Sequence, residues 1–224
     1  MTPWKLLDSK TTAEGALELR QRGDREFLIV IDGRVLMTSR DRRSEQGLAV
    51  LACGALPGRA SAPRVLIGGL GMAYTVRAAL DALPAAAEVV VAELTPAVLA
   101  WCRGPLAVLT AGAVDDPRVH VVIDDVAAVI ARAPRGHYDA IILDLYEGPH
   151  AATQRADDPF YGRAALANSR DALTQGGVLA VWSEEADDAF SRRFTAAGFD
   201  VATHRLGKSR THVVYLGRRI RERR

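Results

Sequence analysis

Acidic residues recur at the ends of three successive predicted strands. They are Glu93, then Asp124 and Asp125, then Asp144 and Glu147. In an open parallel sheet, ligands bind at the carboxyl ends of the strands, near the point where the strand order reverses. We therefore expect these carboxylates to lie together in one site. Exposure of the sheet edge to solvent would not by itself require an acid after each of these strands.

The stretch 64–93 predicts the part of that site that holds a nucleoside. An apolar strand ends in a turn that contains Gly68, Gly69 and Gly71, and a helical pattern follows. Glycines let the backbone approach a ligand where a Cβ would clash, and the free N–H groups of a helix start favour an anionic or oxygen-rich group. A tight turn without a ligand stays open as an alternative, because Tyr74 stands where a dinucleotide fingerprint has Gly or Ala.

The acids of the second and third strands suit the sugar and the base of a nucleoside. Glu93 lies 93 − 71 = 22 residues past the last glycine, and an acid at about 20 residues accepts both hydroxyls of a ribose. Asp125 is a candidate acceptor for an adenine amino group, and Asp124 is a second candidate for the same role. The alternative for each of these acids is a structural role, in which it forms the N-cap of the helix that follows it in the sequence.

The acids after the fourth strand suit an amine. Asp144, Tyr146 and Glu147, in the sequence DLYEGP, open the longest predicted loop, 144–158. Paired carboxylates of this kind hold an ammonium group and take its proton as the amine becomes a nucleophile. A loop built on local Asx-type turns is the alternative.

Strands that alternate with helices must position these residues. Strands are predicted at 65–67, 89–92, 119–123, 138–143, 178–182, 200–205 and 212–216, and helices at 72–83, 96–109, 126–133, 160–173 and 185–197. The alternation implies a parallel sheet covered on both faces. The last two strands have no helix between them, so they form a hairpin and one of them runs antiparallel. Seven strands in this order match the Rossmann-like α/β fold of class I methyltransferases.

The first 60 residues differ from this pattern. Two β-rich runs, 26–31 and 34–38, flank an Asp-Gly pair, which is a strong signal for a two-residue hairpin. Ser39 or Asp41 is expected to cap a helix that runs to about residue 56, where a Pro-Gly pair stops it.

Composition narrows the class of protein. With 224 residues, 49% of them apolar, the chain forms one domain or one domain with a small appendage. We divide it into an N-terminal hairpin and helix at 1–60, a nucleoside-binding domain at 61–217 and a basic tail at 218–224, which we expect to be solvated.

Charge and cysteine content also restrict the class of protein. The net charge of +2 does not indicate a general nucleic-acid-binding protein. Cys53 and Cys102 lie in apolar helical contexts, which indicates reduced, buried thiols in a cytoplasmic protein.

The sequence lacks the motifs of metalloproteins, membrane-spanning proteins, serine hydrolases and P-loop nucleotide-binding proteins. The histidines show no metal-ligand spacing, so we expect no metal site. The most apolar region, 89–114, is interrupted by charged residues and prolines, so we expect no membrane span. The sequence contains no G-x-S-x-G elbow and no Walker lysine.

Taken together, these segments resemble the spermidine synthase family, the polyamine aminopropyltransferases, from about residue 27 to 182. FLIVIDGRVLMTSRD is similar to the family's hairpin, VLIGGLG to its glycine-rich donor loop, and YDAIILDLYEGP to its segment with the catalytic aspartate. The resemblance implies Glu93 as the ribose acid and Asp125 as the adenine acid, with Asp124 in place of a glycine. It further implies Asp144 as the catalytic acid and Glu147 as the second acid.

The resemblance also implies substrates and assembly. The co-substrate is expected to be a sulfonium nucleoside, decarboxylated S-adenosylmethionine or S-adenosylmethionine, with a small-molecule amine as acceptor, no metal, and a homodimer. Two departures affect these expectations. Gly71 stands where the family has an aspartate. Of the family's Tyr–Gln/His–Glu group after Asp41 only Gln46 is present, which the resemblance implies as a further residue that binds the co-substrate, and Arg42 and Arg43 precede it.

Three hypotheses follow. The first is aminopropyl transfer to an amine. The second is a methyltransferase on the same fold, since the loss of an acid at Gly71 removes repulsion against the carboxylate of intact S-adenosylmethionine. The third is a non-catalytic nucleoside-binding homologue, suggested by the missing acceptor residues.

Overall fold

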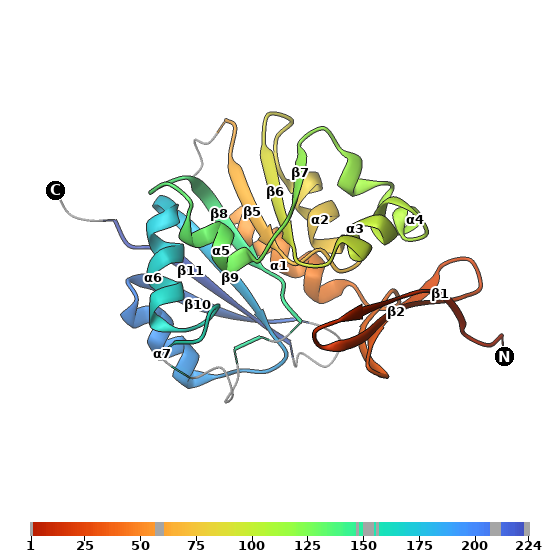
Figure 1. Ribbon diagram of the computed structural model, residues 1–224. Coiled ribbons are helices and arrows are strands. Elements are labelled where there is room, and N and C mark those ends of the chain that lie inside the picture. Colours follow the sequence, from red (N-terminus) through yellow and green to blue (C-terminus); the bar gives the residue numbers. More distant parts are fainter. Residues whose placement is uncertain are drawn as a thin grey trace.

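Parallel strands with an antiparallel hairpin at one edge form the larger of two β-sheets (Figure 1). The computed structural model describes residues 2–56, 61–146, 148–149, 155, 157–206 and 212–221. The strands of the larger sheet are β5 (Arg64–Gly68), β6 (Glu88–Glu93), β7 (Val119–Ile123), β8 (Tyr138–Leu143), β9 (Leu173–Ser183), β10 (Phe199–Leu206) and β11 (His212–Arg219). Their order is β10-β11-β9-β8-β5-β6-β7, and β11 runs antiparallel to both neighbours. The predicted seven-stranded Rossmann-like α/β fold is confirmed.

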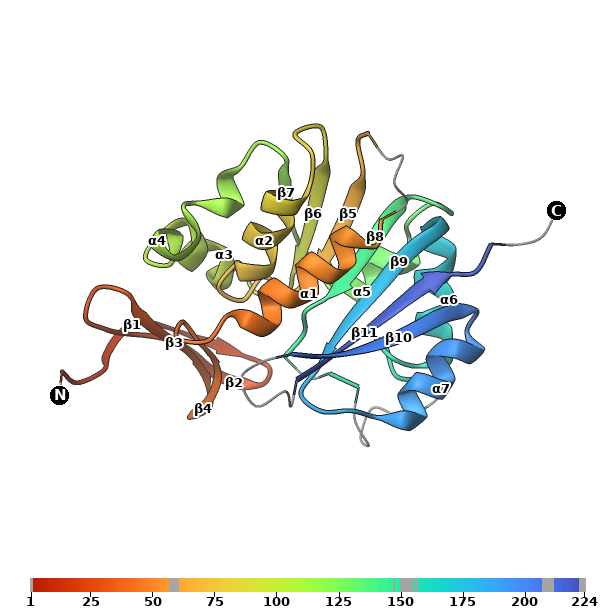
Figure 2. The same cartoon turned by 180° about the vertical axis from the view of Figure 1, so that it is seen from behind.

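The apolar central strands explain why helices cover both faces of this sheet. In β5, Val65 and Ile67 belong to one core and Leu66 to the other, and all three are fully buried. Helices α1 (Arg43–Gly54), α2 (Tyr74–Ala82) and α3 (Pro96–Arg103) pack on the first core, and α5 (Val126–Ala131), α6 (Arg163–Ala172) and α7 (Asp188–Ala196) pack on the second. Figures 1 and 2 show these two layers from opposite sides. Burial on both faces is typical of a parallel sheet.

The helix predicted at 96–109 is divided in the structure. It forms α3 and the short helix α4 (Ala107–Thr110), with a 3₁₀ turn at Ala113–Asp115 beyond them. Gly104 leaves the helical conformation, and Pro105 has no N–H with which to continue the helix.

The glycine pair at 176–177, which lies between the helix predicted at 160–173 and the strand predicted at 178–182, is inside a strand. α6 ends at Ala172, and β9 begins at the next residue. Gly176 has a φ of +80°, and the pairing of β8 with β9 shifts register in this region. A left-handed glycine at a register shift indicates a β-bulge.

The N-terminal segment forms a complete sheet and not only the predicted hairpin. Its strands are β1 (Lys5–Thr12), β2 (Gly15–Arg22), β3 (Glu26–Ile31) and β4 (Arg34–Thr38), paired in that order. Asp32 and Gly33 both have positive φ, 45° and 79°, as the predicted two-residue hairpin turn requires. Trp101 on α3 donates from Nε1 to Asp8 on β1 at 2.8 Å, so the sheet is attached to the larger domain.

The helix that follows this sheet has no side-chain cap of the predicted kind. The N-cap of α1 is Arg42, without a side-chain hydrogen bond to the helix. The Ser39 hydroxyl instead accepts from the Phe27 N–H at 2.9 Å and donates to the Arg25 carbonyl. Asp41 accepts from the Arg43 N–H at 3.3 Å. Ser39 therefore stabilises the sheet, and the Pro-Gly pair predicted to stop the helix lies outside the described residues.

The tail predicted at 218–224 begins two residues later, and the prediction that it is solvated is wrong for Arg219. Arg218 and Arg219 belong to β11. Arg219 is buried and donates to the carbonyls of Arg170 and Leu173. Residues 222–224 lie outside the described part of the chain. Among the helices that are described, none is long and apolar enough to cross a membrane.

Candidate active site

The ends of β5, β6 and β8 meet at the glycine turn, as the sequence predicts. Gly69 N–H donates to the Ala92 carbonyl at the end of β6, and Asp144 N–H donates to the Gly68 carbonyl, both at 2.9 Å. β5 pairs with β6 on one side and with β8 on the other, so the strand order reverses beside β5. This switch point is where doubly wound folds bind ligands.

Packing around the turn explains why each of its three positions is a glycine. Gly69 has a φ of +89°, and a Cβ there would lie 2.4 Å from the backbone oxygen of Asp144. Gly71 has a φ of +51°, and its Cβ would lie 2.9 Å from Sδ of Met37 on β4. A Cβ on Gly68 would meet Val126 at 2.8 Å. The turn brings the Asp144 backbone and the N-terminal sheet close together, and ligand binding by these glycines remains a prediction.

Glu93 is buried at the end of β6 and faces the turn. One carboxylate oxygen accepts from the Leu70 N–H at 3.0 Å and the other from the Thr95 N–H at 2.8 Å. Burial raises the pKa of Glu93, and the backbone donors, Thr95 first, oppose that rise. The N-cap of α3 is Thr95 and not Glu93. Each carboxylate oxygen has a further lone pair, so the geometry leaves acceptor capacity for ribose hydroxyls.

The two aspartates after β7 are engaged locally. Asp125 is the N-cap of α5 and accepts from the Ala127 N–H at 2.8 Å. Asp124 accepts from the Asp125 N–H and forms an ion pair with Arg132. The Asp124 N–H donates to the Glu93 carbonyl at 3.1 Å, so this corner adjoins the glycine turn. The adenine role predicted for the two aspartates remains a prediction.

Asp144 has the environment of a base that works near neutral pH. The Thr75 hydroxyl on α2 donates to Asp144 Oδ2 at 2.5 Å. Burial and the nearby charge of Glu45 raise the pKa of Asp144 to about 7, and the Thr75 hydrogen bond opposes that rise. A general base is most effective when its pKa lies near the working pH.

Thr75, which donates a hydrogen bond to Asp144, and Glu45, whose charge raises its pKa, are two influences on Asp144 that the sequence did not predict. Thr75 is the second residue of α2 and is buried, at 2% exposure. A polar residue among the apolar residues of this helix start was the sequence signal that could have identified it. Glu45 lies in the first turn of α1, far from Asp144 in the sequence. Because no local spacing links it to Asp144, only the packing of α1 reveals the relation.

The remaining predicted residues lie at the edge of this site or outside the described chain. Tyr146 is 40% exposed, and the Arg34 guanidinium lies 4.9 Å from the centre of its ring. Gln46 is on an exposed part of α1, and its N–H donates to the Arg42 carbonyl at 3.0 Å. Glu147, the predicted second acid, lies outside the described residues.

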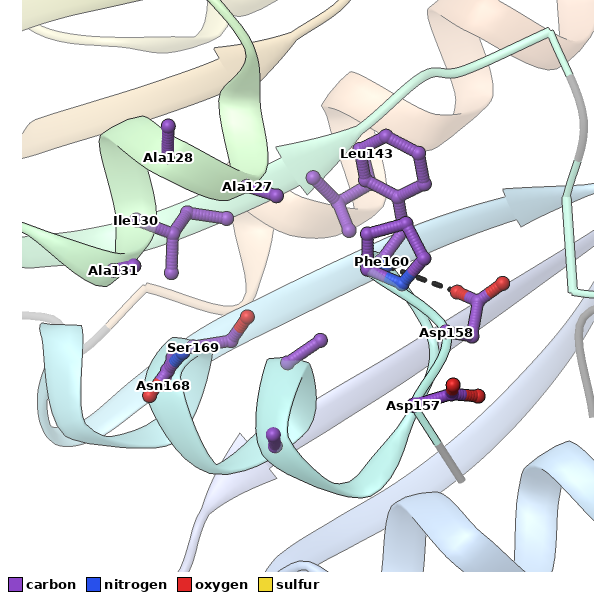
Figure 3. Close-up of a pocket in the computed structure, with 13 residues that line it drawn as sticks. Ala127, Ala128, Ile130, Ala131, Leu143, Asp157, Asp158, Phe160, Asn168 and Ser169 are labelled. Atoms are coloured by element: carbon purple, nitrogen blue, oxygen red, sulfur yellow. Dashed lines mark hydrogen bonds between the residues drawn. The ribbon is translucent and has the colours of Figure 1, made fainter. Parts of the chain in front are cut away.

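A cavity of about 320 Å³ lies between α5 and α6, beside the site (Figure 3). Leu143, directly before Asp144, lines it together with Phe160 and alanines of α5 and α6. Asp158 lies at its rim and accepts from the N–H groups of Phe160 and Tyr161 at 2.9 and 2.6 Å. Most of the residues that line the cavity are apolar, and Asp158, one of its two acids, shapes the segment before α6.

Both cysteines are free and buried. Burial raises the pKa of Cys53 to about 11, and burial and the charge of Glu93 raise that of Cys102 to about 12. The Cys102 thiol donates to the Gly71 carbonyl at 3.3 Å, so it supports the turn. Within the described ranges, no group of three or more His, Cys, Asp or Glu residues is arranged to hold a metal ion.

The family model and the similar proteins point to the same family. Residues 61–187 match the family model described as the spermine/spermidine synthase domain. A polyamine aminopropyltransferase of Mycobacterium tuberculosis is 34% identical over 166 residues, which cover 72% of this chain and 29% of that protein. A polyamine aminopropyltransferase of Ruegeria sp. is 31% identical over 92% of this chain and 71% of its own length. Putrescine N-methyltransferase 4 of Nicotiana tabacum is 31% identical over 60% of this chain and 32% of its own.

The fold has a close structural counterpart. The crystal structure of spermidine synthase from Thermotoga maritima superposes with a TM-score of 0.76 at 20% identity, covering 97% of this chain and 74% of that one. The chain spans about three-tenths of the length of the first of these relatives, 29%. The match of the domain model over residues 61–187 and the similarity to the Ruegeria protein show that the chain belongs to the spermine/spermidine synthase family.

Proposed function

We propose that the protein transfers an aminopropyl group from a sulfonium nucleoside to an amine. The observation that carries the proposal is Asp144, a carboxylate with a pKa near 7 beside the switch point of the sheet. Relatives named polyamine aminopropyltransferases support this reaction class. We further propose decarboxylated S-adenosylmethionine as the donor, a cytoplasmic location and a homodimer.

The donor half of the site consists of the glycine turn and Glu93. The Glu93 carboxylate is held by two backbone N–H groups, so it is fixed before the ligand arrives. Fixing the ribose places the sulfonium group relative to Asp144, and such positioning supplies a large part of the rate of a two-substrate reaction.

The acceptor half depends on Asp144. An alkylamine has an ordinary pKa of about 10.4, so it enters as an ammonium ion. Asp144 accepts one ammonium proton, and the freed nitrogen lone pair attacks the methylene carbon next to sulfur. The new C–N bond forms as the C–S bond breaks, and the bonding pair leaves on sulfur as a neutral thioether. Positive charge moves from sulfur to nitrogen, which becomes a secondary ammonium group, while Asp144 keeps the proton that it accepted.

Methyl transfer is the second candidate, and one observation favours it. At Gly71 the turn carries no acid, and Met37 fills the space that a side chain there would need. Intact S-adenosylmethionine therefore meets no carboxylate at this point of the turn. A relative named putrescine N-methyltransferase is consistent with such a change.

Calorimetry with three nucleosides separates these candidates. We expect the decarboxylated donor to bind more tightly than S-adenosylmethionine, methylthioadenosine to bind as the product, and Glu93→Ala to abolish binding of all three. Glu14→Ala, which changes an exposed acid in the β1–β2 turn, serves as the control. Preference for S-adenosylmethionine would favour the methyltransferase, and no binding of any nucleoside would favour the non-catalytic homologue and refute the site.

A further inference from the structure

The end of β9 places an indole ring beside the proposed base. β8 and β9 run parallel with Leu143 opposite Val181, so the next residues along the two strands, Asp144 and Trp182, are neighbours at a strand spacing of about 4.8 Å. The Trp182 side chain packs against the first core. The hydroxyl that binds Asp144 comes from α2, which packs on the same core. The side chains of Asp144 and Trp182 therefore lie on one face of the sheet.

A histidine on β11 forms an aromatic pair with this indole. β11 runs antiparallel to β9 with Val214 opposite Trp182, so His212, two residues before Val214, lies on the same face. The ring centres of Trp182 and His212 are 5.4 Å apart, in an edge-on arrangement. Gly148, in the loop after Asp144, packs against the Trp182 backbone, since a Cβ there would lie 2.7 Å from the Trp182 carbonyl oxygen. The pair therefore borders the loop that begins at the proposed base.

Each ring of this pair carries a buried nitrogen that has no hydrogen-bond partner among the described residues. These atoms are Nε1 of Trp182 and Nδ1 of His212. The hydroxyl of Ser183, the next residue along β9, donates to the carbonyls of Pro149 and Glu185, so it holds the loop backbone and not the indole. A buried donor without a partner costs free energy, and a bound ligand is one reason for a native protein to keep such a group.

The indole nitrogen restricts what the far end of an acceptor amine can carry. An indole N–H only donates, an ammonium group also only donates, and an oxygen accepts. A second ammonium group therefore leaves the indole unpaired.

Positive charge near the base disfavours a second ammonium group as well. The guanidinium groups of Arg34 and Arg42 lie 4.9 and 5.9 Å from the ring centres of Tyr146 and Tyr74. Neither forms an ion pair with an acid in the described part of the chain. Like charges repel, so these cations favour an acceptor that carries one positive charge over one that carries two.

We propose that Trp182 and His212 bind the far end of the acceptor, and that this end carries an oxygen that accepts hydrogen bonds. This inference rests on the proposed function and makes it more specific, because it names the acceptor class as an amine with a carboxylate or hydroxyl tail. The amine reacts beside Asp144, and the tail extends across the sheet edge toward β9 and β11. Trp182 and His212 determine specificity, since neither contacts the reacting atoms.

Four amines of equal chain length and different tails test this inference. They are 4-aminobutanoate, 4-amino-1-butanol, 1,4-diaminobutane and 1-aminobutane, each titrated by calorimetry into the protein saturated with methylthioadenosine. We expect at least one of the two oxygen-bearing amines to bind about tenfold more tightly than the diamine and the alkylamine. The tighter of these two identifies the tail as a carboxylate or a hydroxyl.

Two tryptophan variants assign the preference to one indole N–H. Trp182→Phe keeps a ring and removes the N–H, so it should abolish the preference for an oxygen tail. It should not lower the melting temperature, because that N–H has no partner among the described residues. Trp101→Phe is the matched control. It loses an N–H that donates to Asp8, so it should lower the melting temperature and keep the preference.

The outcomes separate this inference from the proposed function. Equal or tighter binding of the diamine, or no binding of any of the four amines, would overturn the inference. A preference for an oxygen tail that persists in Trp182→Phe would overturn it too. A preference that depends on Trp182, without aminopropyl product, would instead contradict the proposed reaction and support the recognition of the tail.

Discussion

Replacing the proposed base should stabilise the protein, and by an amount that depends on pH. The pKa of Asp144 is raised from 3.8 to about 7, first by burial and then by Glu45. The unfolded chain loses this proton near pH 4, and the folded chain keeps it to about pH 7. Between these values the folded state binds more protons, so the free energy of unfolding falls as pH rises.

The size of the effect follows from that difference. The interval 7 − 3.8 is about 3 pH units, which corresponds to about 4 kcal/mol at about 1.4 kcal/mol per unit. Asp144→Asn removes the charge and keeps the shape and an acceptor for Thr75. We expect the variant to be more stable than the wild type by about 2 to 4 kcal/mol at pH 8, and equally stable at pH 4, where the wild-type carboxyl is protonated.

Urea denaturation at pH 4 and pH 8 measures this difference, with aminopropyl transfer assayed on the same samples. The exposed Asp24, in the turn between β2 and β3, supplies the control Asp24→Asn, for which no such pH-dependent gain is expected. The variant Asp144→Asn should bind nucleosides and lose turnover. Equal stability of wild type and Asp144→Asn at pH 8 would refute the buried-charge reasoning, and full activity of the variant would refute the assignment of the base.

Two further changes test the supports of Asp144. Thr75→Val removes a hydrogen bond to the ionised carboxylate worth about 1.5 to 3 kcal/mol. The pKa of Asp144 should rise, and the acid limb of the kcat/KM profile should move up by about one to two pH units. Thr75→Ser should restore the limb, and an unmoved limb in Thr75→Val would contradict this role. Gly69→Ala places a Cβ 2.4 Å from the Asp144 carbonyl at a φ of +89°, so it should lower the melting temperature and turnover together. Gly33→Ala is the matched control, since Gly33 has a similar φ of +79° with no atom within 4 Å. Equal losses in both glycine variants would show that backbone strain, and not the contact with Asp144, is responsible.

The fold could be predicted because its signals are local. Val65, Leu66 and Ile67 form a run that only a strand buried on both faces accommodates, and the Asp-Gly pair at 32–33 specifies its own turn. β1 was not predicted, because KLLDSKTT is mostly polar and exposed, so it lacks the apolar alternation by which strands are recognised. The bulge at Gly176 could not be predicted for a related reason. A glycine marks a break in regular structure, but only the partner strand decides whether that break is a helix end or a bulge.

The sequence by itself determined the family of this protein, its sheet, and the acids that follow three of its strands, since each is a short pattern of neighbouring residues. The tertiary structure decided what those acids do. Asp125 caps a helix, Glu93 is held by two backbone N–H groups, and Asp144 has a pKa near 7. That pKa depends on burial, on Thr75 and on Glu45, which lie far from Asp144 along the chain. Desolvation and Coulomb interaction depend on distance in space and not on distance in sequence.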